Sequence, residues 1–356
     1  MAEPCLVVAV QPEVKTHYVT HKTVLEQRRE NIAHYMQLVD NYGLASEHRT
    51  AGRKPGIMVF PENFIGGFGP QRTRTWDTTL ELAIDIPGEE TEALGKKCKE
   101  HNLYIAGANY EKPSKELPDN IYLTGFIIGP DGKLALKYRK INAGISTGVA
   151  FTTSPHDIWD KVSHDPKELF PVLETPYGNV GMMTCYDSHF PETARCLALN
   201  GAEILLLPAQ DYFHTYSGID RWRLRARGRA TENVAYLVAS NWAASPQSEY
   251  PYTCAHSMVV DYEGMVMEEI ESDRESFCCA QIDVNALRKR RMIPSGLNYL
   301  TSLRTEAYAA VYGSKTCWEP SLLSHTKLYN YEDLWAIRGK IQKRLFKEGT
   351  LHEPNP

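Results

Sequence analysis

The chain has 356 residues, of which 42% are hydrophobic and 23% are charged, and it contains 24 Gly and 21 Pro. This composition excludes disorder, collagen and coiled coil, and the length fits one large α/β domain or two ordinary ones. The 39 basic and 44 acidic side chains leave a net charge of −5, so no overall positive field attracts nucleic acid or an anionic membrane.

The apolar segments, the N-terminal sequence and the cysteine spacing indicate what class of protein this is. No apolar run approaches the ~20 residues that span a bilayer. The N-terminal segment has no basic leader, so we expect no secretory signal and a cytoplasmic protein. The eight cysteines form no C-x-x-C pair and no Cys/His ligand spacing. We therefore expect neither structural zinc nor a disulfide framework.

Short apolar segments rich in β-branched residues predict strands. In chain order they cover residues 6–9, 57–60, 103–106, 121–128, 180–184, 204–207, 236–239 and 258–260. Leu25, Ile32, Met36 and Val39 have the spacing of one helical face, and Pro191–Leu199 predicts a helix that starts at Pro and stops before Asn-Gly. Strands that alternate with helices predict an α/β fold with sheets covered by helices.

The C-terminal segment, from about residue 292, is richer in Tyr, Ser and Pro. Its last predicted helix, Tyr331–Lys347, places Leu334, Ile337, Ile341 and Leu345 on one face. Such a helix packs on its own domain or joins a neighbouring subunit, and periodicity alone does not decide between the two.

Three motifs place reactive side chains at the ends of predicted strands. Glu62 follows the strand at 57–60, Lys140 ends a basic segment that includes Lys137 and Arg139, and Cys185 lies between a strand and the Pro-initiated helix. Alternation puts Lys137 and Arg139 on one face of their strand and Lys140 on the other. Singly, the three motifs have ordinary interpretations: a solvated loop charge, a basic strand edge and an inert buried cysteine. At a strand-to-helix bend, however, a cysteine is exposed, and the helix N-terminus favours its thiolate.

Together, Glu62, Lys140 and Cys185 in this chain order resemble the catalytic triad of the nitrilase superfamily of carbon–nitrogen hydrolases. The similarity extends from about residue 5 to residue 291 and includes a helix-to-strand segment at 225–241 and a hairpin at 257–267. It implies a hydrolase domain over residues 1–291 and a C-terminal extension over residues 292–356. The fold it implies is a four-layer α-β-β-α sandwich, in which two mixed β-sheets pack face to face between helices.

The resemblance also implies the role of each residue. Cys185 is expected to be the nucleophile and Glu62 the general base, because a free thiol is only a few per cent ionised near pH 7. Lys140 and the backbone N–H of Tyr186 are expected to stabilise the oxyanion. The resemblance requires no metal and no organic cofactor.

One departure concerns a second glutamate that family members commonly have between the lysine and the cysteine. The stretch directly after Lys140 contains no carboxylate, and Asp157 and Glu168 remain as candidates for an auxiliary acid. His189, Phe64 and Trp242 are candidates for contact with substrate, as are Tyr212 and Phe213, from their places near strand ends.

Two basic clusters have ordinary interpretations. Arg221, Arg225 and Arg229 share a helical face and are expected to pair with local acids such as Asp220 and Glu232. The basic run at 288–291 matches either a helix C-terminus or a nuclear signal.

The leading functional hypothesis is hydrolysis of a small linear amide or N-carbamoyl compound through a cysteine thioester, with release of ammonia or an amine. The Cys-Tyr-Asp sequence at the nucleophile resembles the amidase and carbamoylase branches. The alternatives are a nitrilase that converts a nitrile to a carboxylic acid and ammonia, and a binding scaffold with weak or no activity. The expected partners are a small-molecule amide, carbamoyl or nitrile substrate and further copies of the chain, in a dimer or larger homo-oligomer.

Overall fold

The first strand, β1 (Cys5–Gln11), is apolar on both faces and contributes to two separate cores. Leu6, Val8 and Val10 enter one core. Cys5, Val7 and Ala9 point the opposite way into a second core. Because successive side chains of a strand alternate between faces, this pattern places β1 in the middle of a layered structure. The computed structural model describes residues 2–69, 74–143, 151–211, 216–248, 255–294, 296–324 and 330–352.

Two six-stranded mixed sheets form the two central layers. The first sheet has the order β12-β1-β2-β3-β4-β5, with β2 at Pro55–Glu62, β3 at Tyr104–Glu111, β4 at Tyr122–Ile128, β5 at Leu134–Arg139 and β12 at Ser276–Ile282. The second sheet has the order β11-β10-β9-β8-β7-β6, with β6 at Val172–Thr175, β7 at Gly178–Met182, β8 at Ile204–Pro208, β9 at Tyr236–Ser240, β10 at Met258–Val260 and β11 at Val266–Glu269. The core that contains Val7 and Ala9 also contains Met182, Leu206 and Val238, and it therefore lies between the sheets.

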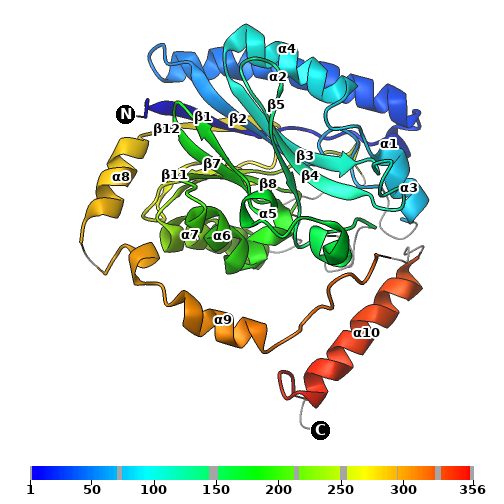
Figure 1. Ribbon diagram of the computed structural model, residues 1–356. Helices are drawn as coiled ribbons and strands as arrows, with labels where there is room; N and C mark the ends of the chain where they lie inside the picture. The colour runs from blue at the N-terminus through cyan, green and yellow to red at the C-terminus, as the bar shows by residue number, and fades with distance from the viewer. Residues whose placement is uncertain are drawn as a thin grey trace.

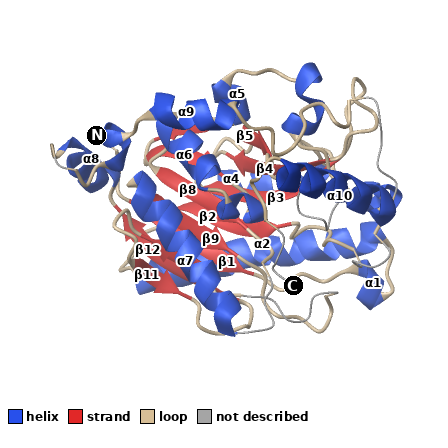
Figure 2. Ribbon diagram, turned by 90° about the horizontal axis from the view of Figure 1, so that it is seen from below, coloured by secondary structure: helices blue, strands red, loops and turns tan. Residues whose placement is uncertain are grey.

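Helices cover the two outer faces, which gives the predicted four-layer α-β-β-α order (Figure 1). Over the first sheet lie α2 (Val24–Arg49) and α4 (Glu89–His101), with the short helices α1 (His17–Thr20) and α3 (Trp76–Leu82) nearby. Figure 2 shows α6 (Pro191–Leu199) and α7 (Tyr216–Asn233) in front of the strands of the second sheet. A third core of Ala and Leu side chains joins these two helices to β8 and β9. Each helical layer thus buries one face of one sheet.

Short helical turns and a C-terminal group of helices complete the described structure. The turns are the 3-10 helices η3 (Pro155–Lys161), η4 (Cys185–His189) and η5 (Tyr299–Ser302) and the four-residue α5 (Pro166–Leu169). The C-terminal helices are α8 (Val284–Met292), α9 (Thr305–Gly313) and α10 (Tyr331–Lys347). None of the helices in these ranges is both long and apolar enough to cross a membrane.

The segment from residue 296 onward contacts the rest of the described chain at only part of its length. Leu334 of α10 and Leu323 are buried with Tyr122 and Ile158. In contrast, every residue of α9 is exposed, including Tyr308, Val311 and Tyr312. The helix α9 therefore has an apolar surface that its own domain leaves uncovered.

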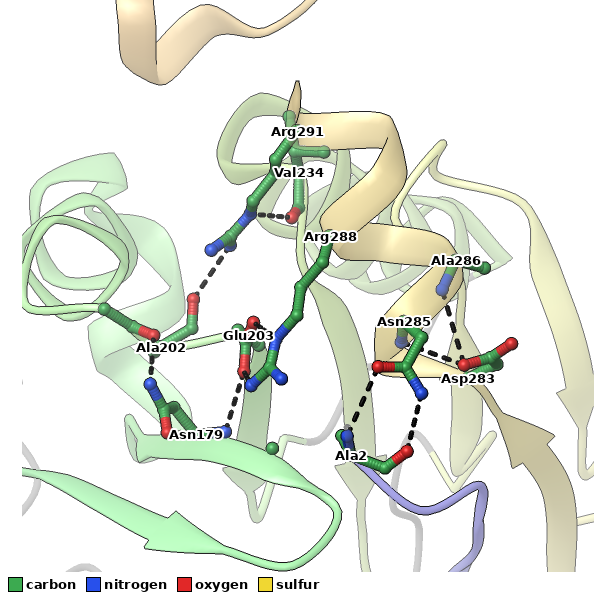
Figure 3. Close-up of polar contacts among 12 residues, drawn as sticks. Ala2, Asn179, Ala202, Glu203, Val234, Asp283, Asn285, Ala286, Arg288 and Arg291 are labelled. Atoms are coloured by element: carbon green, nitrogen blue, oxygen red, sulfur yellow. Dashed lines mark hydrogen bonds and ion pairs between the residues drawn. The ribbon is translucent and has the colours of Figure 1, made fainter. Parts of the chain in front are cut away.

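The basic run in α8 anchors this helix to the start of β8 (Figure 3). Arg288 donates from Nε and Nη2 to the two carboxylate oxygens of Glu203 at 2.6 and 2.8 Å. Arg291 donates to the backbone carbonyls of Val234 and Ala202 at 3.0 and 2.8 Å. The Glu203 carboxylate also accepts from the backbone N–H of Asn179 at 3.0 Å. These arginines therefore fix the beginning of a strand whose other end leads to Gln210, which contacts Cys185.

Candidate active site

A buried ion pair joins the ends of β2 and β5. Lys140 Nζ donates to Glu62 Oε1 at 2.6 Å, and the two side chains are 3% and 1% exposed. The ladder between β2 and β3 shifts register between Val59 and Glu62, which turns the strand end. The indole Nε1 of Trp242 donates to the Glu62 carbonyl at 2.6 Å, and Glu62 N–H donates to the Ala209 carbonyl at 3.3 Å. Residues that follow β8 and β9 of the second sheet therefore hold the main chain at Glu62, at the end of a strand of the first sheet.

The alternation along β5 places its three cations as predicted. Lys137 and Arg139 both pair with Glu111, while Lys140 turns inward to Glu62. Burial alone would lower the pKa of Lys140, but the negative charges around it, that of Glu62 above all, outweigh burial and raise this pKa. Lys140 is therefore a fixed cation at this site.

Cys185 begins the short helical turn η4, three residues after the end of β7. Its φ is 44°, in the left-handed region that non-glycine residues seldom adopt. Such backbone strain is typical of nucleophiles held on a strand-to-helix bend. The Cys185 thiol donates to the Gln210 carbonyl at 3.6 Å. The first backbone hydrogen bond of η4 runs from the N–H of Asp187 to the Thr184 carbonyl. The N–H of Tyr186 lies one residue before this bond, at the start of the turn.

Asp187 fixes the shape of this turn. Its Oδ2 accepts from the Tyr138 hydroxyl at 2.8 Å and from the Thr184 N–H at 3.1 Å. Its Oδ1 accepts from the backbone N–H and the side-chain amide of Asn142 at 2.9 and 3.1 Å. The buried carboxylate thus joins the turn at Cys185 to the chain on both sides of Lys140. The sequence did not indicate this role, because two of the donor residues, Tyr138 and Asn142, lie more than 40 residues away.

The charges of Glu62 and Lys140 both act on the Cys185 thiol, which brings the three predicted residues into one site. Burial, followed by the charge of Glu62, raises the pKa of Cys185 well above its ordinary value, and Lys140 opposes this shift. The resting thiol is therefore protonated at neutral pH. A thiol in this state becomes a thiolate only when a neighbouring base accepts its proton.

Asp211, which the sequence analysis did not select, is a further acid at the site. It follows Gln210 after the end of β8, and its side chain is 14% exposed. Asp211 forms an ion pair with Arg225 of α7. The local pairing expected for the arginine face holds for Arg229 with Glu232, whereas Arg225 reaches a partner in another element. A single sequence gives no signal for this pairing, because it depends on how α7 packs on β8.

The remaining predicted residues lie in varied surroundings. His189 is exposed, and its ring centroid is 4.9 Å from that of Tyr186. Partial desolvation, followed by the positive charges of Arg225 and Lys140, lowers the pKa of His189 to about 4, so its imidazole is neutral at pH 7. Phe64 is fully buried beside Phe60, with ring centroids 5.1 Å apart, in the core between the first sheet and α2.

The two candidate auxiliary acids lie in different settings. Asp157 is buried in η3, where it accepts from Ser154 N–H at 2.9 Å and from Trp318 Nε1 at 3.2 Å. The bond from Trp318 connects the C-terminal segment to η3. Glu168 is exposed on the short helix α5. The loop directly after Ala143 and the predicted pocket residues Tyr212 and Phe213 lie outside the described residues.

One group of side chains in the described ranges has the spacing of metal ligands, namely Asp40, Glu100 and His101. Lys97 Nζ lies 2.8 Å from both Asp40 carboxylate oxygens and 2.8 Å from Glu100 Oε2. The ammonium group occupies the place where a cation would bind, so this cluster is an ion-pair network on the helical layer.

Comparison with known proteins agrees with this geometry. The family model for "Carbon-nitrogen hydrolase" matches residues 7–292. Omega-amidase NIT2 of Mus musculus is 31% identical over 244 residues, which is 67% of this chain and 80% of the relative. The crystal structure of Saccharomyces cerevisiae Nit3, a nitrilase-superfamily member, aligns with a TM-score of 0.64 at 23% identity over 82% of this chain and 95% of that one. An amidase mutant from Nesterenkonia sp. AN1, with an acetamide moiety added covalently at its active-site cysteine, aligns with a TM-score of 0.59 at 17% identity over 86% and 96% of the two chains. The chain therefore belongs to the carbon–nitrogen hydrolase family, on the amidase branch of the nitrilase superfamily, and is a hydrolase of carbon–nitrogen bonds other than peptide bonds.

Proposed function

We propose that this protein hydrolyses small linear amides, including N-carbamoyl compounds, with Cys185 as nucleophile, Glu62 as general base and Lys140 as oxyanion stabiliser. The observation that supports this most directly is the buried ion pair between Glu62 and Lys140 at 2.6 Å, whose two charges both act on the Cys185 thiol. A dry carboxylate beside a fixed ammonium group and a strained cysteine is a costly arrangement for a fold to maintain without a chemical role.

In the acylation half-reaction, the sulfur of Cys185 attacks the amide carbon while its proton passes to the Glu62 carboxylate. The carbonyl oxygen becomes an oxyanion, for which Lys140 Nζ and the Tyr186 N–H are the proposed donors. Removal of one donor from such a site typically lowers kcat by about 100- to 1000-fold. Glu62 then returns the proton to the departing nitrogen, the carbon–nitrogen bond breaks, and ammonia or an amine leaves a thioester on Cys185.

In the deacylation half-reaction, Glu62 accepts a proton from a water molecule, and the resulting hydroxide attacks the thioester carbon. Collapse of the second oxyanion breaks the carbon–sulfur bond and releases the carboxylic acid, and Cys185 regains the proton through Glu62. In each half-reaction Glu62 thus acts first as a base and then, in its protonated form, as an acid.

The name of the omega-amidase relatives favours an amide at the end of a carboxylic acid chain as the first substrate to test. The decisive experiment measures ammonia release from a panel of such amides, N-carbamoyl amino acids and the matching nitriles. We expect the wild type to hydrolyse an amide or a carbamoyl compound and the Cys185→Ala variant to lose this activity.

The control is Cys196→Ala, which removes another half-buried cysteine, eleven residues further along the chain in α6, and should leave the rate unchanged. Turnover of nitriles alone would identify a nitrilase instead. The absence of turnover, together with equal slow labelling of all cysteines by iodoacetamide, would identify a binding scaffold.

We also propose that the chain assembles as a homo-oligomer of at least two copies. The support is the exposed apolar surface of α9, with Tyr308, Val311 and Tyr312 each more than half exposed. The hydroxyl of Tyr312 bonds to Glu192, which places α9 beside α6, the helix that follows the nucleophile turn. Sedimentation of the wild type at micromolar concentration should show a dimer or larger species, and Val311→Glu should shift it towards monomer. A wild-type monomer would contradict this proposal.

A further inference from the structure

A short segment between α9 and α10, at residues 318–324 and referred to below as the strap, lies against the helical turn η3. The backbone N–H of Ser321 donates to the His156 carbonyl at 3.0 Å. The backbone N–H of Leu323 donates to the Asp157 carbonyl at 2.7 Å. Main-chain hydrogen bonds therefore hold the strap against η3.

Side chains at both ends of the strap add to these main-chain bonds. At the first end, the indole Nε1 of Trp318 donates to Asp157 Oδ1 at 3.2 Å. At the other end, the hydroxyl of Ser324 donates to the carboxylate of Asp160, and the Nζ of Lys161 donates to the Ser324 carbonyl. The strap is thus attached to η3 along its whole length.

The contact continues into the first sheet through Tyr122, the first residue of β4. The side chain of Leu323 is buried in one cluster with Tyr122 and with Ile158 of η3. On the same tyrosine ring lies the guanidinium of Arg139, whose Cζ is 3.7 Å from the ring centroid. The strap therefore closes a small core over the start of β4, beside the end of β5.

The main chain at Lys140 depends on the same part of β4. Its backbone N–H donates to the Leu123 carbonyl at 2.9 Å. The backbone N–H of Thr153, which lies two residues before η3, donates to the Ile121 carbonyl at 2.7 Å. The start of β4 is therefore bonded to the chain that enters η3 and, two residues later, to Lys140.

We propose that the strap is a positioning segment of this active site, which holds η3 and the start of β4 in place and thereby keeps the Lys140 ammonium group at Glu62. The inference rests on the proposed function, because it concerns the group that stabilises the oxyanion. A misplacement of about 1 Å in such a group can lower the rate by about 100-fold. The strap lies outside residues 7–292, so the family model does not contain it.

The test weakens the strap in the full chain with the double variant Trp318→Phe/Leu323→Ala, which removes the donor to Asp157 and part of the buried cluster. With the amide that the wild type hydrolyses fastest, we expect kcat to fall by about three- to tenfold and KM to change by less than about twofold, because the oxyanion forms only in the transition state. The loss is partial, since the bonds from Asp187 also hold the chain around Lys140.

Hydrogen–deuterium exchange provides a second readout that does not depend on turnover. The amides of Thr153 and Lys140 both donate to the start of β4. In the double variant, peptides that contain these amides should exchange faster by about threefold or more, because local opening becomes easier. Exchange in the second sheet, at β8 and β9, should stay as in the wild type.

The matched control is Trp335→Phe/Leu351→Ala, which makes the same two substitutions at side chains of the C-terminal segment that are 60% and 38% exposed. It should leave kcat and the two exchange rates unchanged. If the double variant at the strap fails to fold, Trp318→Phe alone, compared with Trp335→Phe, repeats the test with one hydrogen bond as the loss.

Unchanged kcat, or unchanged exchange at Thr153 and Lys140, in the folded variant would overturn the inference. A change of the same size in the control, or a larger change in KM than in kcat, would overturn it as well. If the wild type hydrolyses no amide, the proposed function fails, whereas the exchange rates still decide whether the strap holds the chain at Lys140. The two failures are thereby distinguished.

Discussion

The substitution Lys140→Met tests whether the fold holds an ionised carboxylate in a dry environment. Methionine keeps the length of the lysine side chain but removes the ammonium group that lies 2.6 Å from Glu62. Glu62 is 1% exposed, so water cannot replace the lost partner. Removing one partner of a buried ion pair typically costs about 3–5 kcal/mol of stability, because the other charge is left uncompensated.

Protonation of Glu62 in the variant sets an upper limit to this cost. A free glutamate side chain has a pKa of about 4.3, and each pH unit above it adds about 1.4 kcal/mol to the cost of holding a carboxyl in the protonated form. The variant should therefore be less stable than the wild type by nearly 4 kcal/mol at pH 7 and by about 1 kcal/mol at pH 5.

Proton linkage determines whether the stability deficit of the variant grows or shrinks with pH. In the folded variant the buried carboxyl keeps its proton, whereas in the unfolded chain it ionises as the pH rises above about 4.3. A proton bound more tightly in the folded state makes stability fall with increasing pH, so the deficit grows from pH 5 to pH 7.

The assay is urea unfolding of both proteins at pH 5 and pH 7, with ammonia release measured in parallel. Lys137→Met is the control, because this lysine lies three residues earlier, is 31% exposed and shares Glu111 with Arg139. Its loss should cost less than about 1 kcal/mol and show no comparable pH dependence. A deficit in Lys140→Met that is equal at both pH values would refute the reasoning, since it would indicate lost packing rather than an unpaired carboxyl.

Further expectations concern the nucleophile turn and the helical layers. Asp187→Asn replaces one acceptor oxygen with a donor and leaves two of the four donors around it without an acceptor. We therefore expect urea unfolding to show a free energy of unfolding lower by about 2–3 kcal/mol. We also expect kcat to fall by more than any change in KM. Full activity in this variant would contradict the positioning role of Asp187. Gly95→Ala places a Cβ 2.4 Å from the Gly132 carbonyl oxygen and should lower the free energy of unfolding by about 1–3 kcal/mol. At Gly228, in α7, an added Cβ meets nothing within 4 Å, so Gly228→Ala should raise the free energy of unfolding by about 1 kcal/mol. Thermal unfolding of the Gly95→Ala and Gly228→Ala variants distinguishes the effect of crowding from that of helix propensity.

The local arrangement at the candidate site could be predicted because it depends on period and chain direction. Strand alternation separates Lys140 from Lys137 and Arg139, and the structure confirms this separation through Glu62 and Glu111. The strand, turn and Pro-initiated helix around Cys185 also appear as expected, although β7 ends at Met182, two residues before the predicted strand end. Local backbone preferences govern both features, so the signal lies within a few residues.

Contacts between distant segments could not be predicted in this way. Asp187 binds Tyr138 and Asn142, and Asp211 binds Arg225, across separations that no local pattern reports. The basic run lies at the C-terminal end of α8, as the helix C-terminus interpretation predicted. Its contacts with the start of β8 through Arg288 and Arg291 could not be predicted, for the same reason.

The amino-acid sequence by itself predicted alternating strands and helices and the face of the strand on which Lys140 lies, because hydrophobic period and strand alternation are properties of short segments. The four-layer order and the choice of Glu62, Lys140 and Cys185 as candidates came from the resemblance to a family. Only the tertiary structure decided which charges surround the sulfur of Cys185. The parallel pairing of β7 with β8 brings Gln210 and Asp211 beside the nucleophile turn, and the packing of α7 supplies Arg225. Electrostatic interactions act through space and depend on burial, so a list of residues in chain order does not contain them.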